Sequence, residues 1–236
     1  MKKLMIAAAA LTAGFAMADV ISSDIVGYAQ GGLQSGASML TPQFQNIGAS
    51  EAMPLESLTP TGDGTSDAVY IQTLDAYGRT VDSYYWNDWM YESACWVDGE
   101  YNAVSGVSFE PGQGLWVYGA NDTQGLQSAG KVGKSDVAVQ LQNGATGTGN
   151  PFPTSVALTD ILPLGDGTSD TVYIQTLDAY GRTVDSYYWN DWMYKNPCWV
   201  DGEYNAVTDV NFAAGQGLWI YGANSEQSIQ FPAPEL

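Results

Sequence analysis

The 236-residue sequence contains no histidine, only two cysteines and only seven basic residues. Without histidine the chain cannot form a Ser-His-Asp or Cys-His nucleophile, and it cannot bind a metal through imidazole. The 26 acidic residues give a formal charge of −19, and nucleic-acid phosphates repel so acidic a protein. We therefore expect no catalytic residues, no enzyme activity and no nucleic-acid partner.

Long apolar runs are scarce as well, and the one that is present lies at the N-terminus. Residues 1–3 (Met-Lys-Lys) are basic, residues 4–15 are apolar, and residues 16–18 read Ala-Met-Ala. This pattern is typical of a secretory signal peptide, and the run is too short to span a bilayer. We expect cleavage after residue 18 and no membrane span afterwards. The protein would then be secreted, and would lie in the periplasm, at the cell surface or outside the cell.

What the sequence has in excess is repetition. Residues 62–121 match residues 165–224 at a constant offset of 103, and 50 of the 60 positions are identical. Weaker similarity continues upstream, where residues 33–37 resemble residues 141–145. An internal duplication of this length predicts two domains rather than a solenoid. After the signal peptide we expect two modules, module 1 (19–132) and module 2 (133–236).

Within each module the pattern is that of β-structure. No stretch after the signal peptide shows helical periodicity over three turns. Residues 68–74 and 79–86 read as two strands, and Asp75-Ala76-Tyr77-Gly78 between them predicts a hairpin turn with a positive φ at the glycine. Pro111-Gly112 predicts another turn before a strand at 115–118. We therefore expect an all-β fold of two tandem, small β-sandwich or barrel-like modules. Further strands are expected at 26–29, 131–132, 137–141 and 229–231.

A series of short motifs recurs in a fixed order along module 1. They are Ile25-Val26-Gly27-Tyr28, Leu33-Gln34-Ser35-Gly36-Ala37, Gly62-Asp63-Gly64 and Pro111-Gly112-Gln113-Gly114-Leu115-Trp116-Val117. The series resembles a family of secreted bacterial modules of unknown function that is common in Verrucomicrobia and Lentisphaerae. Module 2 departs from this pattern at its start, where residues 137–139 read Val-Ala-Val. The resemblance implies a secreted β-module and carries no established activity.

Aromatic residues are concentrated in the duplicated region, which contains all eight tryptophans. Because side chains alternate between the faces of a strand, Tyr84 and Trp86 share one face and Tyr85 takes the other. Both faces cannot be core in a two-layer module. We therefore expect some aromatic surface to be exposed or to lie in an interface, and we expect Trp89, after the Asn87-Asp88 turn, to be exposed.

These aromatic residues are the candidate ligand-binding set. An exposed set favours a sugar platform or a protein contact, and the alternative is packing in the core and between the modules. The candidates are Tyr84, Trp86, Trp89 and Trp116 in module 1 and Tyr187, Trp189, Trp192 and Trp219 in module 2.

Two acidic turns are duplicated. Asp63 and Asp67 flank Gly64-Thr65-Ser66, and Asp166 and Asp170 stand at the equivalent positions. Paired carboxylates with hydroxyl and carbonyl oxygens make calcium a candidate ligand, although the distal glutamate of an EF-hand is missing. The alternative is an Asp-Gly turn whose carboxylate bonds to its own backbone. No other cofactor is expected.

The two cysteines, Cys95 and Cys198, occupy equivalent positions in the repeats. Neither module can therefore form a disulfide of its own. A bond between them would close a loop of about 100 residues and stabilise the fold by about 4–5 kcal/mol in the chain-entropy account. The alternatives are a bond between two molecules, or free thiols.

Together these observations predict a secreted, non-catalytic structural or adhesive protein of the cell surface or extracellular space. The first alternative is a carbohydrate-binding protein that uses exposed aromatic residues. A more distant one is a glycan-degrading enzyme with two carboxylates. Extracellular glycans, other surface proteins and further copies of the chain are the partners that this interpretation allows.

Overall fold

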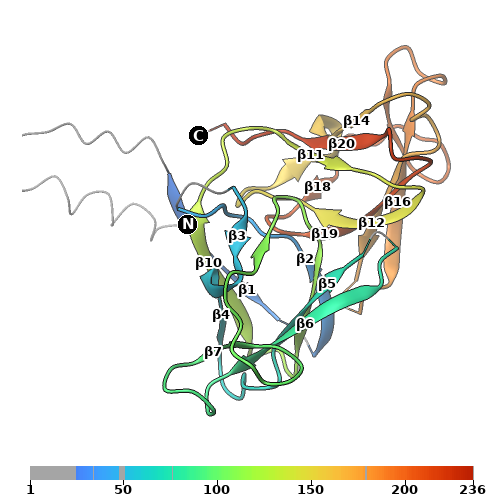
Figure 1. Cartoon of the computed structure of the whole chain (residues 1–236). Coiled ribbons are helices and arrows are strands. Elements are labelled where there is room, and N and C mark those ends of the chain that lie inside the picture. The colour runs from blue at the N-terminus through green and yellow to red at the C-terminus, as the bar shows by residue number, and fades with distance from the viewer. Residues whose placement is uncertain (1–24, 34, 48–50, 76, 179, 236) are drawn as a thin grey trace, which may run out of the picture.

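The computed structural model describes residues 25–33, 35–47, 51–75, 77–178 and 180–235 (Figure 1). The predicted signal peptide, residues 1–18, lies outside these ranges. The described chain consists of strands, turns and two short 3-10 helices, η1 (Leu55–Ser57) and η2 (Leu158–Asp160). The predicted all-β class is confirmed. No helix in the described ranges is long and apolar enough to cross a membrane.

Module 1 contains antiparallel sheets of five, three and two strands, in the orders β2-β9-β5-β6-β7, β1-β10-β4 and β3-β8. The strands are β1 (Val26–Gly32), β2 (Gly36–Leu40), β3 (Met53–Pro54), β4 (Leu58–Thr61), β5 (Tyr70–Leu74), β6 (Thr80–Asn87), β7 (Cys95–Val97), β8 (Ser108–Phe109), β9 (Leu115–Gly119) and β10 (Gly125–Lys131).

Module 2 repeats these sheets in the orders β12-β19-β15-β16-β17, β11-β20-β14 and β13-β18. Its strands are β11 (Val137–Gln140), β12 (Gly144–Gly149), β13 (Val156–Ala157), β14 (Leu162–Leu164), β15 (Tyr173–Leu177), β16 (Thr183–Asn190), β17 (Cys198–Val200), β18 (Asn211–Phe212), β19 (Gly217–Gly222) and β20 (Ser228–Phe231). None of these sheets combines strands from both modules.

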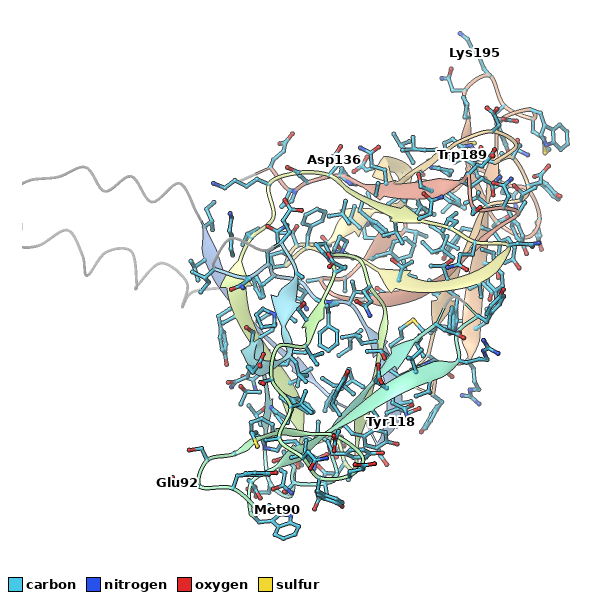
Figure 2. The ribbon with its side chains drawn as sticks, in the orientation of Figure 1. Met90, Glu92, Tyr118, Asp136, Trp189 and Lys195 are labelled. Atoms are coloured by element: carbon cyan, nitrogen blue, oxygen red, sulfur yellow. The ribbon has the colours of Figure 1, made fainter. Side chains whose placement is uncertain are left out.

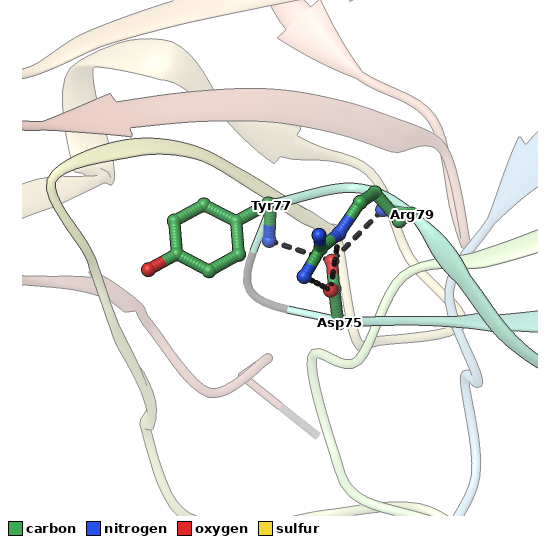
Figure 3. A network of polar contacts seen from close by, with 3 residues as sticks. All are labelled: Asp75, Tyr77 and Arg79. Carbon is green, nitrogen blue, oxygen red and sulfur yellow. Dashed lines mark hydrogen bonds and ion pairs between the residues drawn. The ribbon is translucent and has the colours of Figure 1, made fainter.

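The predicted hairpin between β5 and β6 is present, and its local chemistry explains it (Figure 3). Oδ1 of Asp75 accepts hydrogen bonds from the backbone N–H groups of Tyr77 and Arg79, at 2.8 and 2.9 Å. The Arg79 guanidinium lies 2.6 Å from the other carboxylate oxygen. Gly78 has φ +73, a conformation that glycine adopts without strain. The turn of module 2 has the same contacts.

Each module encloses its own apolar core between the five-stranded and three-stranded sheets. Trp96 and Trp199 are almost fully buried, and each indole N–H donates to a backbone oxygen of the facing layer, at 2.8 Å to Leu58 and 2.9 Å to Ile161. A buried tryptophan whose N–H has a partner contributes apolar area without leaving an unsatisfied donor. The equivalent residue in each repeat therefore has the same structural role.

The two modules pack against each other through reciprocal contacts. The rings of Trp116 and Trp219 lie 6.4 Å apart, centroid to centroid. A Cβ built at Gly78 would lie 2.6 Å from the Trp219 ring, and one built at Gly181 would lie 2.5 Å from the Trp116 ring. Each hairpin turn thus reaches the tryptophan of the other module. Only glycine leaves room for that approach.

Backbone hydrogen bonds also join the modules, and each module contributes one turn to them. Gly114 N–H donates to Gly147 O at 3.1 Å, and Thr41 N–H donates to Gly215 O at 3.0 Å. In both cases the turn before β9 or β19 of one module meets the first strand of the other module's five-stranded sheet. Reciprocal contacts of this kind arise when two copies are related by an approximate twofold axis.

Candidate functional site

Two clusters of exposed aromatic residues include the loops that follow β6 and β16, although the most exposed single aromatic residues are Tyr77 and Tyr180 in the hairpin turns. Figure 2 shows Met90 and Glu92, from the first loop, at one end of the molecule, and Lys195, from the second, at the opposite end. Trp89 and Trp192 are each 63% exposed, which confirms the prediction for Trp89. We call Trp89, Met90, Tyr91 and Tyr101 tip 1, and Trp192, Met193, Tyr194 and Tyr204 tip 2; all eight are exposed.

A carboxylate holds the exposed tryptophan of tip 1 in place. Trp89 Nε1 donates to Asp67 Oδ2 at 2.9 Å, and the amide of Asn87 donates to the other oxygen, Oδ1, at 3.3 Å. Asp67 itself has φ +59 and donates its backbone N–H to Trp86 O at 2.7 Å. The only polar atom of the indole therefore has a partner, and the exposed part of the ring is apolar.

The start of the loop is fixed from below by a buried amide. Asn87 is 0% exposed, and its Oδ1 accepts the backbone N–H of Met90 at 2.9 Å. The backbone N–H of Asp88 donates to Ser66 Oγ at 3.1 Å. Each loop residue from 87 to 90 thus has a specific hydrogen bond, so tip 1 is held in one conformation before any partner binds.

The two tyrosines of tip 1 are joined to each other. Tyr91 Oη donates to Tyr101 O at 2.9 Å and accepts the N–H of Ala103 at 3.0 Å. Tyr101 has φ +63 at the end of a turn closed by Asp98. The N–H of Asn102 donates to the Asp98 carboxylate and, together with the Asn102 side chain, lowers the pKa of Asp98. The second loop is therefore also ordered from within.

Tip 2 has the same geometry. Trp192 Nε1 donates to Asp170 Oδ2 at 2.7 Å, the N–H of Met193 donates to Asn190 Oδ1 at 2.9 Å, and Tyr194 Oη donates to Tyr204 O at 2.9 Å. The loops after β6 and β16 differ at three neighbouring positions, where Glu92-Ser93-Ala94 is replaced by Lys195-Asn196-Pro197, and the loops that carry Tyr101 and Tyr204 differ where Ser105-Gly106 is replaced by Thr208-Asp209. The duplication has therefore kept the aromatic surface and changed the charge beside it.

The other six aromatic candidates make packing contacts. Tyr84 and Trp86 are half-buried against the core of module 1, as Tyr187 and Trp189 are in module 2. Trp116 and Trp219 meet between the modules. Packing in the core and between the modules is the predicted alternative to an exposed binding set, and these six residues follow it. Of the eight candidate residues, only Trp89 and Trp192 have large exposed surfaces.

A second aromatic group, which was not predicted, lies on the outer face of each five-stranded sheet. Tyr70 stacks on Tyr118 with ring centroids 4.2 Å apart and planes 8° apart, and Tyr85 lies 5.3 Å from Tyr70. Burial raises the pKa of Tyr70, and the neighbouring Tyr118 and Tyr85 raise it further. Module 2 contains the same stack, Tyr173 on Tyr221. Alternation along β5, β6 and β9 was the signal that could have found it.

The bond between Asp67 and Trp89 was also missed, although strand pairing predicts it. β5 and β6 are antiparallel neighbours, with Tyr70 opposite Tyr85. Residues just before β5 must therefore lie beside residues just after β6. The proposed calcium ligands Asp67 and Asp170 take part in this bond instead of standing free.

The remaining acidic candidates lie in the predicted turns. In module 1 the Gln124 side chain donates to the backbone oxygens of Asp63 and Gly64, at 3.2 and 2.7 Å. Gln227 makes the same bonds to Asp166 and Gly167. Within the described ranges, no group of three or more His, Cys, Asp or Glu residues is arranged to hold a metal ion. Calcium binding at these turns stays an untested prediction.

Both cysteines are free thiols. Cys95 begins β7 and Cys198 begins β17, which are the outermost strands of two different sheets. The modules meet near β2 and β12, at the other edge of those sheets. The disulfide between Cys95 and Cys198 is therefore not formed in this structure, because the approximate twofold axis does not bring their loops together.

No protein-family model, no curated protein and no solved structure matches the chain. A proposal for its function therefore depends on the geometry of its own surfaces. The two tips are the most specific of these, since each combines an exposed aromatic cluster with a hydrogen-bond network that holds it in place.

Proposed function

We propose that this is a secreted, non-catalytic adhesive protein of the cell surface or extracellular space, and that its two aromatic tips are the contact surfaces. The observation that carries the proposal is the duplicated exposure of Trp89 and Trp192, each held by an aspartate. Tryptophan and tyrosine are the residue types that dominate binding energy at protein contacts. A loop already ordered loses little conformational freedom on binding.

The position of the tips favours a bridging role. Met90 and Lys195 lie at opposite ends of the molecule (Figure 2). Two sites that face away from each other cannot both bind one flat surface, so they gain no avidity there. They are suited to joining two partners, as an adhesive or matrix protein does.

The charge of the chain limits the partner. With a formal charge of −19, the protein is repelled by strongly anionic surfaces, and salt screens this repulsion. Neutral or basic partners meet no such barrier. The resemblance of module 1 to secreted bacterial modules supports the same extracellular setting and remains an expectation.

The test is to remove the tryptophans and to measure surface binding and bridging separately. Labelled protein is added to isolated envelopes of the producing cells, and bound protein and envelope clumping are recorded for wild type, Trp89→Ala, Trp192→Ala and the double variant. We expect each single variant to bind but to lose clumping, and the double variant to lose both.

The matched control is Val81→Ser with Val184→Ser, because these valines are 59% and 60% exposed but lie outside the tips. This variant should behave as wild type. If the double tryptophan variant binds and clumps envelopes normally, the tips are not the contact surfaces. Fractionation that finds the protein only in the soluble periplasm would reject the adhesive role.

Carbohydrate binding is a second candidate function, and one observation favours it. The exposed Trp89 ring has its N–H satisfied by Asp67, so its apolar face is free to stack on the C–H face of a sugar. Isothermal titration calorimetry with neutral polysaccharides, which needs no tryptophan as reporter, should saturate in the wild type and in Trp89→Phe with Trp192→Phe. It should not saturate when both residues are alanine. No response across a broad panel would reject this function.

A further inference from the structure

The two modules share a fold but differ in their interiors at one place. Module 1 contains a pocket of about 100 Å³ between β1 and β10 on one side and β9 on the other. Most of its lining is apolar, including Met53, Leu58 and Val117, and no charged side chain lines it. Thr41 and Ser128 contribute its side-chain hydroxyls.

Strand pairing identifies the equivalent positions in module 2. Ala29 pairs with Ser128 in module 1, and Val137 pairs with Phe231 in module 2. Two residues further along the first strands, Gly31 corresponds to Val139. Three small residues of module 1 thus stand where module 2 has two valines and a phenylalanine.

The larger residues fill the corresponding space in module 2. Phe231 is 0% exposed within the core, and Val137 and Val139 pack against that core. In module 1 a Cβ built at Gly31 would meet no heavy atom within 4 Å. The pocket is therefore the space that module 2 uses for side chains and module 1 does not.

The turn that covers this space also has a smaller residue in the case of the module 1 pocket than at the equivalent place in module 2. Ala214, from the turn before β19, lines the pocket of module 1. The reciprocal residue is Pro111, whose neighbour Gly112 lies against Val139; a Cβ built at Gly112 would be 2.5 Å from that side chain. Alanine therefore covers the pocket of module 1, whereas the larger proline stands in the turn that covers the equivalent place in module 2.

One polar group at the pocket lacks a partner. Thr41 is 3% exposed, and its buried Oγ1 has no hydrogen-bond partner in the described chain. A buried hydroxyl without a partner costs free energy, and a ligand recovers it when the Thr41 side chain rotates its Oγ1 from Gly149, where a Cβ built on that glycine would meet it, toward the pocket. Thr146 Oγ1 in module 2 is the other buried hydroxyl without a partner among the described residues, and it does not line this pocket.

We propose that the pocket of module 1 is a binding site for a small uncharged molecule with a compact apolar body and one hydrogen-bonding group. An engineered cavity of about 150 Å³ holds benzene, so the pocket of about 100 Å³ accepts an apolar body of roughly four to six heavy atoms. A charged ligand would lose its hydration without gaining a counter-charge. The hydrogen-bonding group would pair with Thr41.

The test uses cyclopentanol as the probe and the Met53 methyl group as the reporter, because Met53 lines the pocket and is 1% exposed. In methyl NMR spectra of the intact protein, the Met53 signal should shift to saturation. The Val156 methyls, at the equivalent place in module 2, should not shift. Butyrate, of similar size but charged, should have no effect on either residue.

Variants that copy module 2 supply the controls. Gly31→Val and Ser128→Phe should each weaken cyclopentanol binding at least tenfold, and Gly31→Val is the milder change if Ser128→Phe does not fold. Thr41→Val keeps the shape, and should weaken cyclopentanol by about tenfold, the effect of one hydrogen bond, while leaving cyclopentane binding unchanged.

Three results would overturn the proposal. They are a Met53 shift that never saturates, an equal shift at Val156, and an unchanged affinity in both filled variants. A pocket that holds only water would give the first of these. None of these results bears on the tips, which lie in other loops.

Discussion

Module 1 and module 2 are nearly identical where they face solvent at the tips, and they differ where they face their own interiors. The tips retain the same tryptophan, the same aspartate and bonds of similar length. The interiors differ at Ser128 and Phe231, which occupy equivalent positions. Identical surfaces on different interiors support the proposal that the tips are the shared contact surfaces, and they leave the pocket of module 1 as the feature that the modules do not share.

The largest expected effect on stability comes from replacing a core residue of module 2 with its counterpart from module 1. Phe231→Ser removes a fully buried ring and should lower the free energy of unfolding by about 3–5 kcal/mol, since the cavity cannot collapse completely. Urea denaturation measures this. The reverse change, Ser128→Phe, should alter stability by less than about 1.5 kcal/mol, because the pocket receives the ring. Equal losses in both variants would show that the interiors do not differ as described.

The next effect concerns the contact between the modules. Gly78→Ala and Gly181→Ala place a Cβ within 2.6 Å of a tryptophan ring, and each should lower the free energy of unfolding by about 1–3 kcal/mol through overpacking. Gly106→Ala is the control, because Gly106 also has a positive φ but no neighbour within 4 Å. The stability that Gly106→Ala loses should therefore reflect backbone strain alone, without overpacking. If all three variants lose equal stability, the tryptophans yield and the contact is not tight.

A smaller effect is expected at the tips. Asp67→Ala and Asp170→Ala remove the acceptor of the indole N–H and should free the tryptophan, at a cost of about 1 kcal/mol each for an exposed bond. Tryptophan fluorescence anisotropy should fall equally in both variants. The Asp67→Asn variant keeps one acceptor oxygen, so its fluorescence anisotropy should fall less than that of Asp67→Ala. Unequal changes in the two modules would contradict the equivalence of the tips.

The smallest effect is the response to acid. The Arg79 side chain donates to Asp75 and lowers its pKa, and Arg182 does the same for Asp178. A carboxyl whose pKa is lowered by folding stabilises the fold at neutral pH, and this contribution is lost as pH falls below about 4. Asp75→Asn and Asp178→Asn should therefore flatten the acid side of the stability curve by equal amounts. Stability measured from pH 6 to pH 2 checks this.

Local sequence signals predicted much of the fold. The β5–β6 hairpin, the positive φ at Gly78 and Gly112, and the exposure of Trp89 follow from turn chemistry and from alternation along strands. The candidate site was predicted only in part, because the alternatives for Asp67 were a calcium ligand and a turn residue, and its hydrogen bond to Trp89 was not among them. Strands β2 and β4 were missed, since residues 36–40 and 58–61 carry no strong strand pattern.

The sequence by itself determined the all-β class, the repetition, the turns and the alternation of aromatic faces, because those depend on neighbouring residues. Only the tertiary structure decided which aromatic face meets the other module, which space stays open beside Ser128, and that Cys95 and Cys198 lie apart. These outcomes depend on how distant surfaces fit each other. Long-range packing of this kind leaves no periodic signal along the chain.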